Sequence, residues 1–223
     1  MPPAQALAAE REDADARTRI VDAAERLFAE HGYHAVSLRT IMGLAQVNVS
    51  AVHYYFGSKK NLLQAVLDRR AAPINRARKE RLFRCIDRNG RVASVEEILE
   101  AYIGPALEVC SDPGGQLFVR VSALASVDPS PDVQDIMQSI YDETARLFVH
   151  ALRRACPRLK EADLYWRLNC VYGAMQYLRA NNGRVARVLN RKPRPLDSRT
   201  VQEALRHVVP YLAAGFSLPS RAP

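Results

Sequence analysis

Apolar side chains recur at helical spacing along most of this chain. Ile20, Ala24, Leu27 and Phe28 fall on one face at about 3.6 residues per turn, and similar stripes return in later segments. No segment alternates apolar and polar residues over the length of a strand. The periodicity therefore predicts an all-α fold of about nine helices, with three short helices first and a larger helical bundle after them.

Capping residues divide this pattern into separate helices. Two short helices, over 38–45 and 49–55, each follow a good N-cap residue, Ser37 and Asn48, and a longer helix is expected from Lys59. The later helices are marked by two capping boxes, Ser94-x-x-Glu97 and Thr200-x-x-Glu203, and by a Ser-Pro-Asp start. Glycines or prolines mark their ends. These helices are expected over 94–110, 116–127, 130–155, 161–182 and 198–216.

The 223 residues divide into three parts on this pattern. Residues 1–16 are Ala-rich and polar without a helical stripe, so we expect a mobile arm there, before a first helix that begins at Thr18. Residues 17–64 hold the short helices, and residues 65–223 form the larger bundle. Within the bundle, the Arg- and Pro-rich stretch 184–195 is expected to be a connector.

The net charge of +8 is concentrated in one segment. Residues 61–92 hold nine basic and three acidic side chains, whereas residues 1–60 hold seven of each. Two interpretations stay open at this point: a solvated helix face, or a positive field that attracts DNA over long range. The basic side chains concerned are Arg69, Arg70, Arg76, Arg78, Lys79, Arg81, Arg84, Arg88 and Arg91.

Several function classes find no support in the sequence. Motifs of nucleotide-binding loops, serine hydrolases and zinc proteases are absent, so we expect no catalytic site and no cofactor. The five histidines have no metal-ligand spacing, and we expect no metal site. Convergence of scattered thiols at a metal- or redox-sensing site stays open as an alternative. The four cysteines, expected to be free thiols, are Cys85, Cys110, Cys156 and Cys170.

The hydrophobic content indicates a globular protein without a membrane span. Hydrophobic residues make up 48% of the chain, which is enough for a sizeable buried core. No apolar run approaches the ~20 residues that a membrane span needs. The N-terminus also lacks a secretory signal, so we expect a cytoplasmic protein with no membrane partner.

Two short helices joined by a four-residue turn and braced by a third are typical of a helix-turn-helix, although an ordinary helical hairpin has the same spacing. In the second helix, Val47, Val52 and Phe56 are expected to face inward. Lys59 and Lys60, at the next helix start, are suited to share one phosphate with backbone N–H groups. The small, hydroxylic or aromatic side chains expected to project outward or flank the helix are Ser50, Ala51, His53, Tyr54 and Tyr55.

Residues 18–66 resemble the DNA-binding domain of the tetracycline-repressor (TetR) family of bacterial transcription regulators. The resemblance implies a homodimeric repressor that binds a palindromic double-stranded DNA operator and is released by a small-molecule effector. The matching elements are Ile20-Val-Asp-Ala-Ala-Glu-Arg-Leu-Phe28, Gly32-Tyr33, Ser37-Leu38-Arg39-x-Ile41 and Val52-His-Tyr-Tyr-Phe-Gly-Ser-Lys-Lys-Asn-Leu62.

The resemblance also implies DNA contacts by position. Arg39 matches the base-reading arginine of the family, and Thr40 is either a phosphate donor or solvated. The sequence departs from the family at Gln46, where glycine is usual in the turn, and at Val49, where a basic residue is common. Ala51 replaces a common threonine, which favours apolar contacts to thymine methyls. The full candidate set is Ser37, Arg39, Thr40, Asn48, Ser50, Ala51, His53, Tyr54, Lys59 and Lys60.

For the C-terminal bundle, the resemblance implies dimerisation through helices 161–182 and 198–216 and an enclosed ligand pocket. Residues 94–182 also resemble, more weakly, the fatty-acid-responsive PsrA-type branch, through Ser94-x-Glu-Glu-Ile-Leu, Leu117-Phe-Val-Arg-Val, Tyr141-x-Glu and Tyr165-Trp-Arg-Leu, which implies a hydrophobic or acyl-type effector. The candidate interface residues are Trp166, Leu205, Val208, Val209, Leu212 and Phe216.

Polar or aromatic residues within otherwise apolar helices are the candidates for lining the pocket. Arg120 has two interpretations: it binds a ligand carboxylate, or it pairs internally with an acid such as Glu143. The candidate pocket residues are Tyr102, Phe118, Arg120, Asn169 and Gln176.

Overall fold

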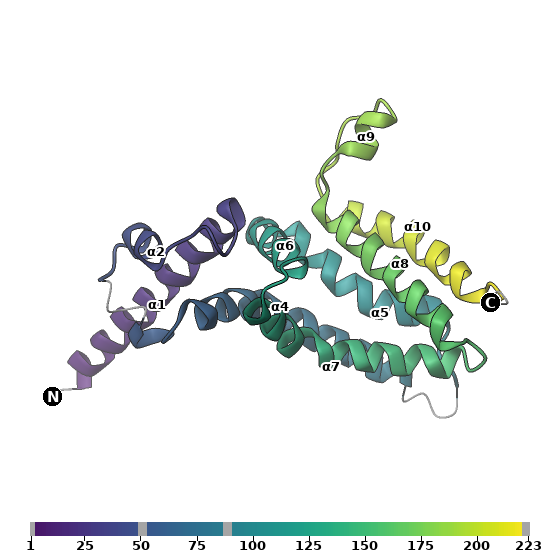
Figure 1. The fold of residues 1–223 in the computed structure, drawn as a ribbon, viewed down its shortest axis with the longest axis horizontal. Helices are drawn as coiled ribbons and strands as arrows, with labels where there is room; N and C mark the ends of the chain where they lie inside the picture. The colour runs from purple at the N-terminus through teal and green to yellow at the C-terminus, as the bar shows by residue number, and fades with distance from the viewer. Residues whose placement is uncertain (1–2, 49–52, 87–90, 220–223) are drawn as a thin grey trace.

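A computed structural model describes residues 3–48, 53–86 and 91–219 of the chain. All regular secondary structure in these ranges is helical, as the periodicity predicted. The N-terminal part consists of α1 (Pro3–His31) and α2 (Leu38–Ala45), followed by helical residues 53–55. Helix α4 (Lys59–Ile86) then leads into the larger bundle (Figure 1).

The bundle contains the remaining helices in chain order. Figure 1 shows α9 and its connectors projecting away from the bundle beyond the ends of α8 and α10. The elements are α5 (Val95–Glu108), the 3-10 helix η1 (Val109–Ser111), α6 (Pro113–Ser126), α7 (Pro131–Ala155), α8 (Glu161–Ala180), α9 (Arg184–Val188) and α10 (Ser198–Ser217).

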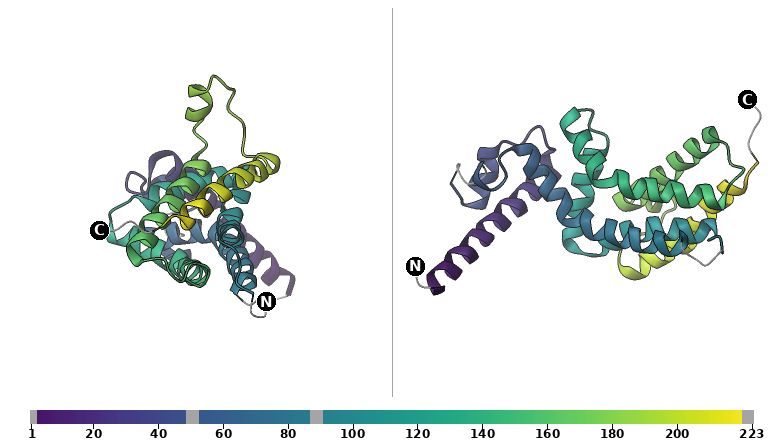
Figure 2. Two further views of the ribbon diagram at one scale, coloured as in Figure 1. Left: turned by 90° about the vertical axis from the view of Figure 1, so that its right-hand side faces the viewer. Right: turned by 90° about the horizontal axis from the view of Figure 1, so that it is seen from below.

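Helix α1 begins at Pro3 and therefore includes the segment for which we expected a mobile arm before Thr18. Alanine has the highest intrinsic helix propensity, so an Ala-rich segment forms a helix without an amphipathic stripe to signal it. Side-chain contacts continue along this extension, because Arg19 pairs with Asp15 one turn earlier at 2.7 Å and Tyr55 donates a hydrogen bond to Asp13. Figure 2 shows the extended α1 as a rod leading away from the bundle.

The turn after α2 forms without the glycine that is usual in the family. Gln46 adopts the left-handed conformation itself, with φ 54° and ψ 47°, and its backbone N–H points to the carbonyls of Met42 and Gly43. Left-handed backbone is accessible to a polar, unbranched residue at a modest cost. The second short helix, predicted over 49–55, is described only at residues 53–55, because Val49–Val52 lie outside the described residues.

The structure differs from the expected pattern in the cap of α10, in the start of α6 and in the presence of α9. Asp197, not Thr200, caps α10, and it accepts a 2.7 Å hydrogen bond from the Thr200 backbone N–H. Glu203 pairs with Arg194 instead of completing a capping box. Helix α6 begins at Pro113 instead of Gln116, since proline is favoured in the first helical turn. The expected connector over 184–195 contains the short helix α9. The Ser94–Glu97 capping box is confirmed.

One apolar core runs from the N-terminal helices into the bundle. Helix α4 packs against α1, α5, α6 and α7, and α10 packs against α5. Because α4 is continuous through residues 64 and 65, the expected boundary between the N-terminal part and the bundle falls inside one helix. Helix α4 therefore connects the N-terminal part to the bundle without a break.

Candidate functional site

The exposed face of α2 carries the first group of predicted contact residues. Ile41, Met42 and Ala45 bury the opposite face, which leaves Arg39 exposed. Ser37 caps the helix, because its Oγ accepts a 3.1 Å hydrogen bond from the Thr40 backbone N–H and lies 2.7 Å from Thr40 Oγ1. The two hydroxyls thus fix the start of the helix that carries Arg39.

The second group lies around the following helical turn. Tyr54 is 77% exposed, and Asn48 and His53 are exposed as well. The His53 ring Nδ1 lies 3.2 Å from the Gly57 carbonyl oxygen, which holds the ring against the end of the turn. Phe56 is buried and Val47 is half-buried, as expected for inward anchors. Three further predicted residues, Ser50, Ala51 and Val52, lie outside the described residues.

The two lysines at the start of α4 have different surroundings. Lys59 Nζ lies 4.5 Å from the centre of the Tyr33 ring, and burial lowers the pKa of Lys59. Lys60 Nζ lies 3.0 Å from carboxylate oxygens of both Asp132 and Asp135, at the start of α7. The hydrogen bond to Asp132, and then that to Asp135, raises the pKa of Lys60. Lys60 is thus paired within the protein, which corrects the expectation that both lysines face one phosphate.

The basic segment of α4 corresponds to neither expected interpretation as a whole. Most of its described cations pair with carboxylates of neighbouring helices. This is possible because α4 packs against other helices on several sides. These pairs are Arg69 with Asp22 and Glu25, Arg70 with Asp112, Lys79 with Glu143, and Arg81 with Glu108, while Arg91 lies 3.7 Å from Glu97. Arg88 lies outside the described residues.

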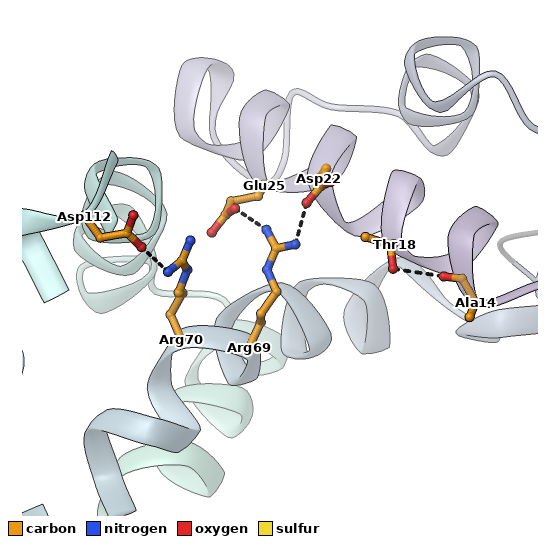
Figure 3. A network of polar contacts seen from close by, with 7 residues as sticks. All are labelled: Ala14, Thr18, Asp22, Glu25, Arg69, Arg70 and Asp112. Carbon is orange, nitrogen blue, oxygen red and sulfur yellow. Dashed lines mark hydrogen bonds and ion pairs between the residues drawn. The ribbon is translucent and has the colours of Figure 1, made fainter. Parts of the chain in front are cut away.

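Arg69 and Arg70 connect three helices at the junction between the N-terminal part and the bundle. Figure 3 shows Arg69 directed toward Asp22 and Glu25 of α1, and Arg70 directed toward Asp112 at the start of α6. Burial raises the pKa of Glu25, and the attraction of Arg69 opposes that change. Consecutive arginines of α4 therefore bind α1 and α6 at the same level of the molecule.

A cavity of about 300 Å³ lies inside the bundle, between α4, α5, α6, α7 and α8. Aromatic, aliphatic and thioether groups form most of its wall, including Ile74, Met137 and Tyr172. The Tyr102 ring stacks on the Phe148 ring, with 4.1 Å between the ring centres. Such an apolar space with a few polar groups is typical of a small-molecule site.

Two of the five predicted pocket residues line this cavity. Tyr102 and Gln176 do so, and Gln176 donates a 3.2 Å hydrogen bond to Ser126. Phe118 is fully buried in the neighbouring core. Asn169 is exposed and donates a hydrogen bond to the Tyr165 carbonyl one turn earlier, because it lies on the outer face of α8. The pocket expectation is therefore wrong for Asn169.

Arg120 follows neither of its two predicted roles in this cavity. It is exposed on the outer side of α6 and lines a separate cavity between α6 and α8. Glu143, the acid proposed as its partner, pairs with Lys79 of α4 instead. The reason is that α6 turns this face away from α7, on which Glu143 lies.

Two buried arginines of the cavity were not among the predicted pocket residues. Arg78 of α4 is 3% exposed and Arg179 of α8 is 8% exposed. The signal was present, because Arg78 follows Ile74 by one turn and Arg179 follows Met175 by one turn, on the buried stripe of each helix. Because Arg78 also belongs to the basic segment of residues 61–92, composition alone does not reveal its buried position.

Helices α8 and α10 form an exposed face on one side of the bundle. Trp166 is 67% exposed and Tyr211 is 78% exposed, with Tyr165 and Tyr177 on the same two helices. Arg167 donates two 2.8 Å hydrogen bonds, to the carbonyls of Phe216 and Leu218, and so holds the end of α10 against α8.

Most of the predicted interface residues of α10 point the other way. They are buried within the protomer, in which α10 packs against α5 and α8. Val208 is half-buried. The buried four are Leu205, Val209, Leu212 and Phe216.

The part of the chain that the structure describes contains no group of three or more His, Cys, Asp or Glu side chains arranged to hold a metal ion. Cys85 and Cys110 are buried, Cys156 is half-buried and Cys170 is exposed, all in the reduced thiol form. Burial raises the pKa of Cys110, which disfavours the reactive thiolate. Within the same ranges, no helix is both long and apolar enough to span a bilayer.

Family sequence models match both parts of the chain. The model described as "Bacterial regulatory proteins, tetR family" matches residues 20–66, and "Tetracyclin repressor-like, C-terminal domain" matches residues 100–215. The chain belongs to the tetR family. It is therefore a DNA-binding transcriptional regulator, and the first match covers α2 and the start of α4, where the exposed contact candidates lie.

Among curated proteins, this tetR-family chain is 35% identical over 141 residues to the HTH-type transcriptional repressor Rv3405c of Mycobacterium tuberculosis. That match covers 60% of this chain and 66% of the relative, just under two thirds of its length. The HTH-type transcriptional repressor AcnR of Corynebacterium glutamicum is 30% identical over 86 residues, which is 39% of this chain and 42% of that protein.

Solved structures of the same fold cover nearly the whole regulator. The fatty acid degradation regulator FadR from Bacillus halodurans superposes with a TM-score of 0.62 at 16% identity, over 87% of this chain and 94% of that chain. The TetR family transcriptional regulator PfmR from Thermus thermophilus gives 0.61 at 17% identity, over 92% and 97%. These likenesses show the fold.

Proposed function

We propose that this tetR-family protein is a homodimeric repressor that leaves a palindromic operator when a small hydrophobic or acyl-type molecule enters the cavity between α4 and α8. One observation carries the proposal. Helix α4 begins beside the predicted DNA contacts at Lys59 and contributes Ile74 and Arg78 to the cavity wall. A ligand that displaces this wall therefore acts on the helix that positions the DNA-binding part.

The DNA contacts that we propose share an exposed surface. Arg39 reads base edges, and Tyr54 and Lys59 bind phosphates, together with the hydroxyls at the start of α2. Exposure of the α2 face and of Tyr54 supports this assignment. The remaining proposed contacts are Asn48, Ser50, Ala51 and His53.

Exposed aromatic side chains on α8 and α10 support the homodimer. Trp166, Tyr177 and Tyr211 form an apolar surface that a second copy of the same face would cover. Each copy then presents one recognition helix, and a two-fold operator matches the two-fold symmetry of the protein. Half-site centres about 34 Å apart, or a multiple of this, follow from the pitch of DNA.

Coupling between ligand and DNA requires that the ligand binds one arrangement of the dimer better than the other. The Arg69 and Arg70 ion pairs support a route for that coupling, because they bind α4 to α1 and to α6. When α4 and α6 move apart around a ligand, the spacing of the two recognition helices changes. Operator affinity then falls.

Selection from a random DNA duplex library with the purified full chain tests this function. We expect a palindromic consensus among the bound duplexes, and a complex of two chains per site by light scattering. A Tyr54→Ala variant provides the control, because loss of this phosphate contact weakens binding to all sequences alike. Absence of any enriched sequence from the wild-type selection at moderate salt would contradict the proposal.

A further inference from the structure

Arg78 is buried at the wall of the cavity without a carboxylate partner among the described residues. Its Nε donates a 2.9 Å hydrogen bond to the Tyr102 carbonyl, and its guanidinium lies 4.1 Å from the centre of the Tyr102 ring. Its two Nη groups reach Asn75 Oδ1 at 3.5 Å and the Met175 sulfur at 3.4 Å. All these partners are neutral, so the positive charge is held in place but not neutralised.

Arg179 enters the same cavity from α8. Its Nη1 donates a 3.2 Å hydrogen bond to Gln176 Oε1, and its guanidinium lies 5.5 Å from the centre of the Phe118 ring. Its Nε is buried and has no acceptor among the described residues. Burial lowers the pKa of Arg179; the nearby Tyr141 and Cys110 oppose that change, and the charge of Arg78 adds to it.

Other charges near the cavity leave this pair uncompensated. Asp142 lines the cavity, but its carboxylate accepts a 2.9 Å hydrogen bond from the exposed Arg146 on its own helix. Buried charges in proteins are ordinarily paired, because removing an ion from water is costly. Two unpaired guanidiniums at one cavity are therefore unusual unless an anion occupies it.

The rest of the wall defines what else the anion must carry. Ile74, Met137 and Met175 present aliphatic and thioether surface, and Tyr102 and Tyr172 present rings. A volume of about 300 Å³ is at the small end of ligand sites. An inorganic ion would leave most of this apolar surface empty, whereas a small organic acid covers it.

We propose that the cavity binds a small organic carboxylate, with its carboxylate between Arg78 and Arg179 and its apolar body against Tyr102, Met137 and Tyr172. Guanidinium groups bind carboxylates through paired, charge-assisted hydrogen bonds, which neutral ligands of the same shape do not form. This inference rests on the proposed function, because it names the chemical class of the effector.

Calorimetry and thermal shift on the full chain without DNA test the proposal. The probes are octanoate and phenylacetate, each compared with its primary amide, and inorganic phosphate. We expect both acids to bind and to raise Tm, and the amides to bind about ten- to a hundredfold more weakly, the effect of losing hydrogen bonds to a charged group. Equal binding of acid and amide would overturn the proposal, and so would binding of phosphate without either acid.

Two variants of Arg179 locate the site. Arg179→Gln should weaken acid binding about tenfold or more and remove the preference for acid over amide. Arg179→Lys, which keeps the charge but loses the planar fork, should retain part of that preference, and it carries the test if the glutamine variant does not fold. The controls are Arg120→Gln, in the neighbouring cavity, and Arg154→Gln, on the surface of α7, and both should bind acids like the wild type. Unchanged acid binding by the Arg179 variants, or a loss in Arg120→Gln equal to theirs, would overturn the placement.

A ligand-free measurement gives a second, independent readout. Arg179→Met keeps a flexible, unbranched side chain and removes an uncompensated buried charge, so it should raise Tm in the absence of acids. A fall in Tm would mean that Arg179 stabilises the apo fold and would count against an anion site. Acid binding that leaves operator affinity unchanged would support this inference and contradict the proposed ligand response. Operator binding by a protein that binds no acid would overturn this inference and leave the proposed DNA binding intact.

Discussion

Lys60 and Asp132 join the start of α4 to the start of α7, with 3.0 Å between Nζ and Oδ1. Asp135 accepts from the same ammonium one turn later on α7, also at 3.0 Å. The adjacent Lys59 has no such acid among the described residues and lies against the Tyr33 ring. Two neighbouring lysines of the same type thus differ in their surroundings: Lys60 is paired within the protein, and Lys59 stays a proposed DNA contact.

Alanine substitution should separate these two lysines. Lys59→Ala is expected to weaken binding to every duplex and to reduce the slope of log K against log salt by about one, since one phosphate contact is lost. Lys60→Ala should leave that slope unchanged, because its ammonium is already neutralised by Asp132 and Asp135. Titrations of one duplex at four salt concentrations measure both. An equal loss of slope in Lys60→Ala would contradict the division.

Arg39→Ala should relax sequence preference. Loss of a bidentate contact to a base costs ~1–3 kcal/mol on the best site and much less on sites with a different base at that position. Affinities for the selected operator and for its single-base variants measure the change. Arg26→Ala is a matched control, because Arg26 is an exposed arginine of α1 that pairs with Glu30. An unaltered preference would remove Arg39 from readout.

Asp128 should make stability depend on pH in the acid range. Its Oδ1 accepts hydrogen bonds from the Ser130 hydroxyl and backbone N–H at 2.6 and 2.9 Å, and His34 lies 2.9 Å from its other oxygen. The Ser130 hydroxyl first, and then the backbone N–H and His34, lower the pKa of Asp128 below 3.8.

A carboxyl whose pKa is lower in the folded state contributes stability above its unfolded pKa, and that stability is lost as pH falls through the folded pKa. Asp128→Asn should therefore have a lower Tm than the wild type at pH 6. The difference should shrink as pH falls below 3.8. Thermal melts across this range measure it, and a difference that does not change with pH would contradict the assigned cause.

Trp166→Glu should abolish the proposed dimer without unfolding the protomer. A buried, unpaired carboxylate at the centre of an apolar interface is strongly unfavourable, whereas an exposed glutamate on a monomer is not. Light scattering should report a fall from twice 25.0 kDa to 25.0 kDa. Phe83→Glu, at an exposed aromatic position on α4, is the control and should remain dimeric.

Leu212→Ala should act on the protomer rather than on its association surface. Leu212 is buried on α10, and truncating such a side chain costs ~2–5 kcal/mol through lost burial and the cavity left behind. Chemical denaturation measures this loss. A change in association constant with no change in unfolding free energy would instead return Leu212 to an interface role.

Local features allowed much of the fold to be predicted. Ser37 and the Ser94–Glu97 box form their capping hydrogen bonds with residues three positions away. These interactions can therefore be predicted from neighbouring residues in the sequence. The match of residues 20–66 to the family likewise rests on a contiguous segment. The start of α1 at Pro3 could not be predicted from hydrophobic periodicity, because alanine favours a helix without producing an amphipathic stripe.

Long-range packing decided the rest. Periodicity shows that α10 has an apolar stripe but not what covers it, so it predicts Leu212 at a partner chain, whereas Leu212 is buried within the protomer. The partners of Lys60 are 72 and 75 residues away, and Arg78 meets Met175 across 97 residues. Most helices, several of their caps and the family could be predicted from the sequence, since these depend on neighbours within a few residues. Which charges are neutralised and which stay unpaired at the cavity could not be predicted, because that depends on how distant helices pack.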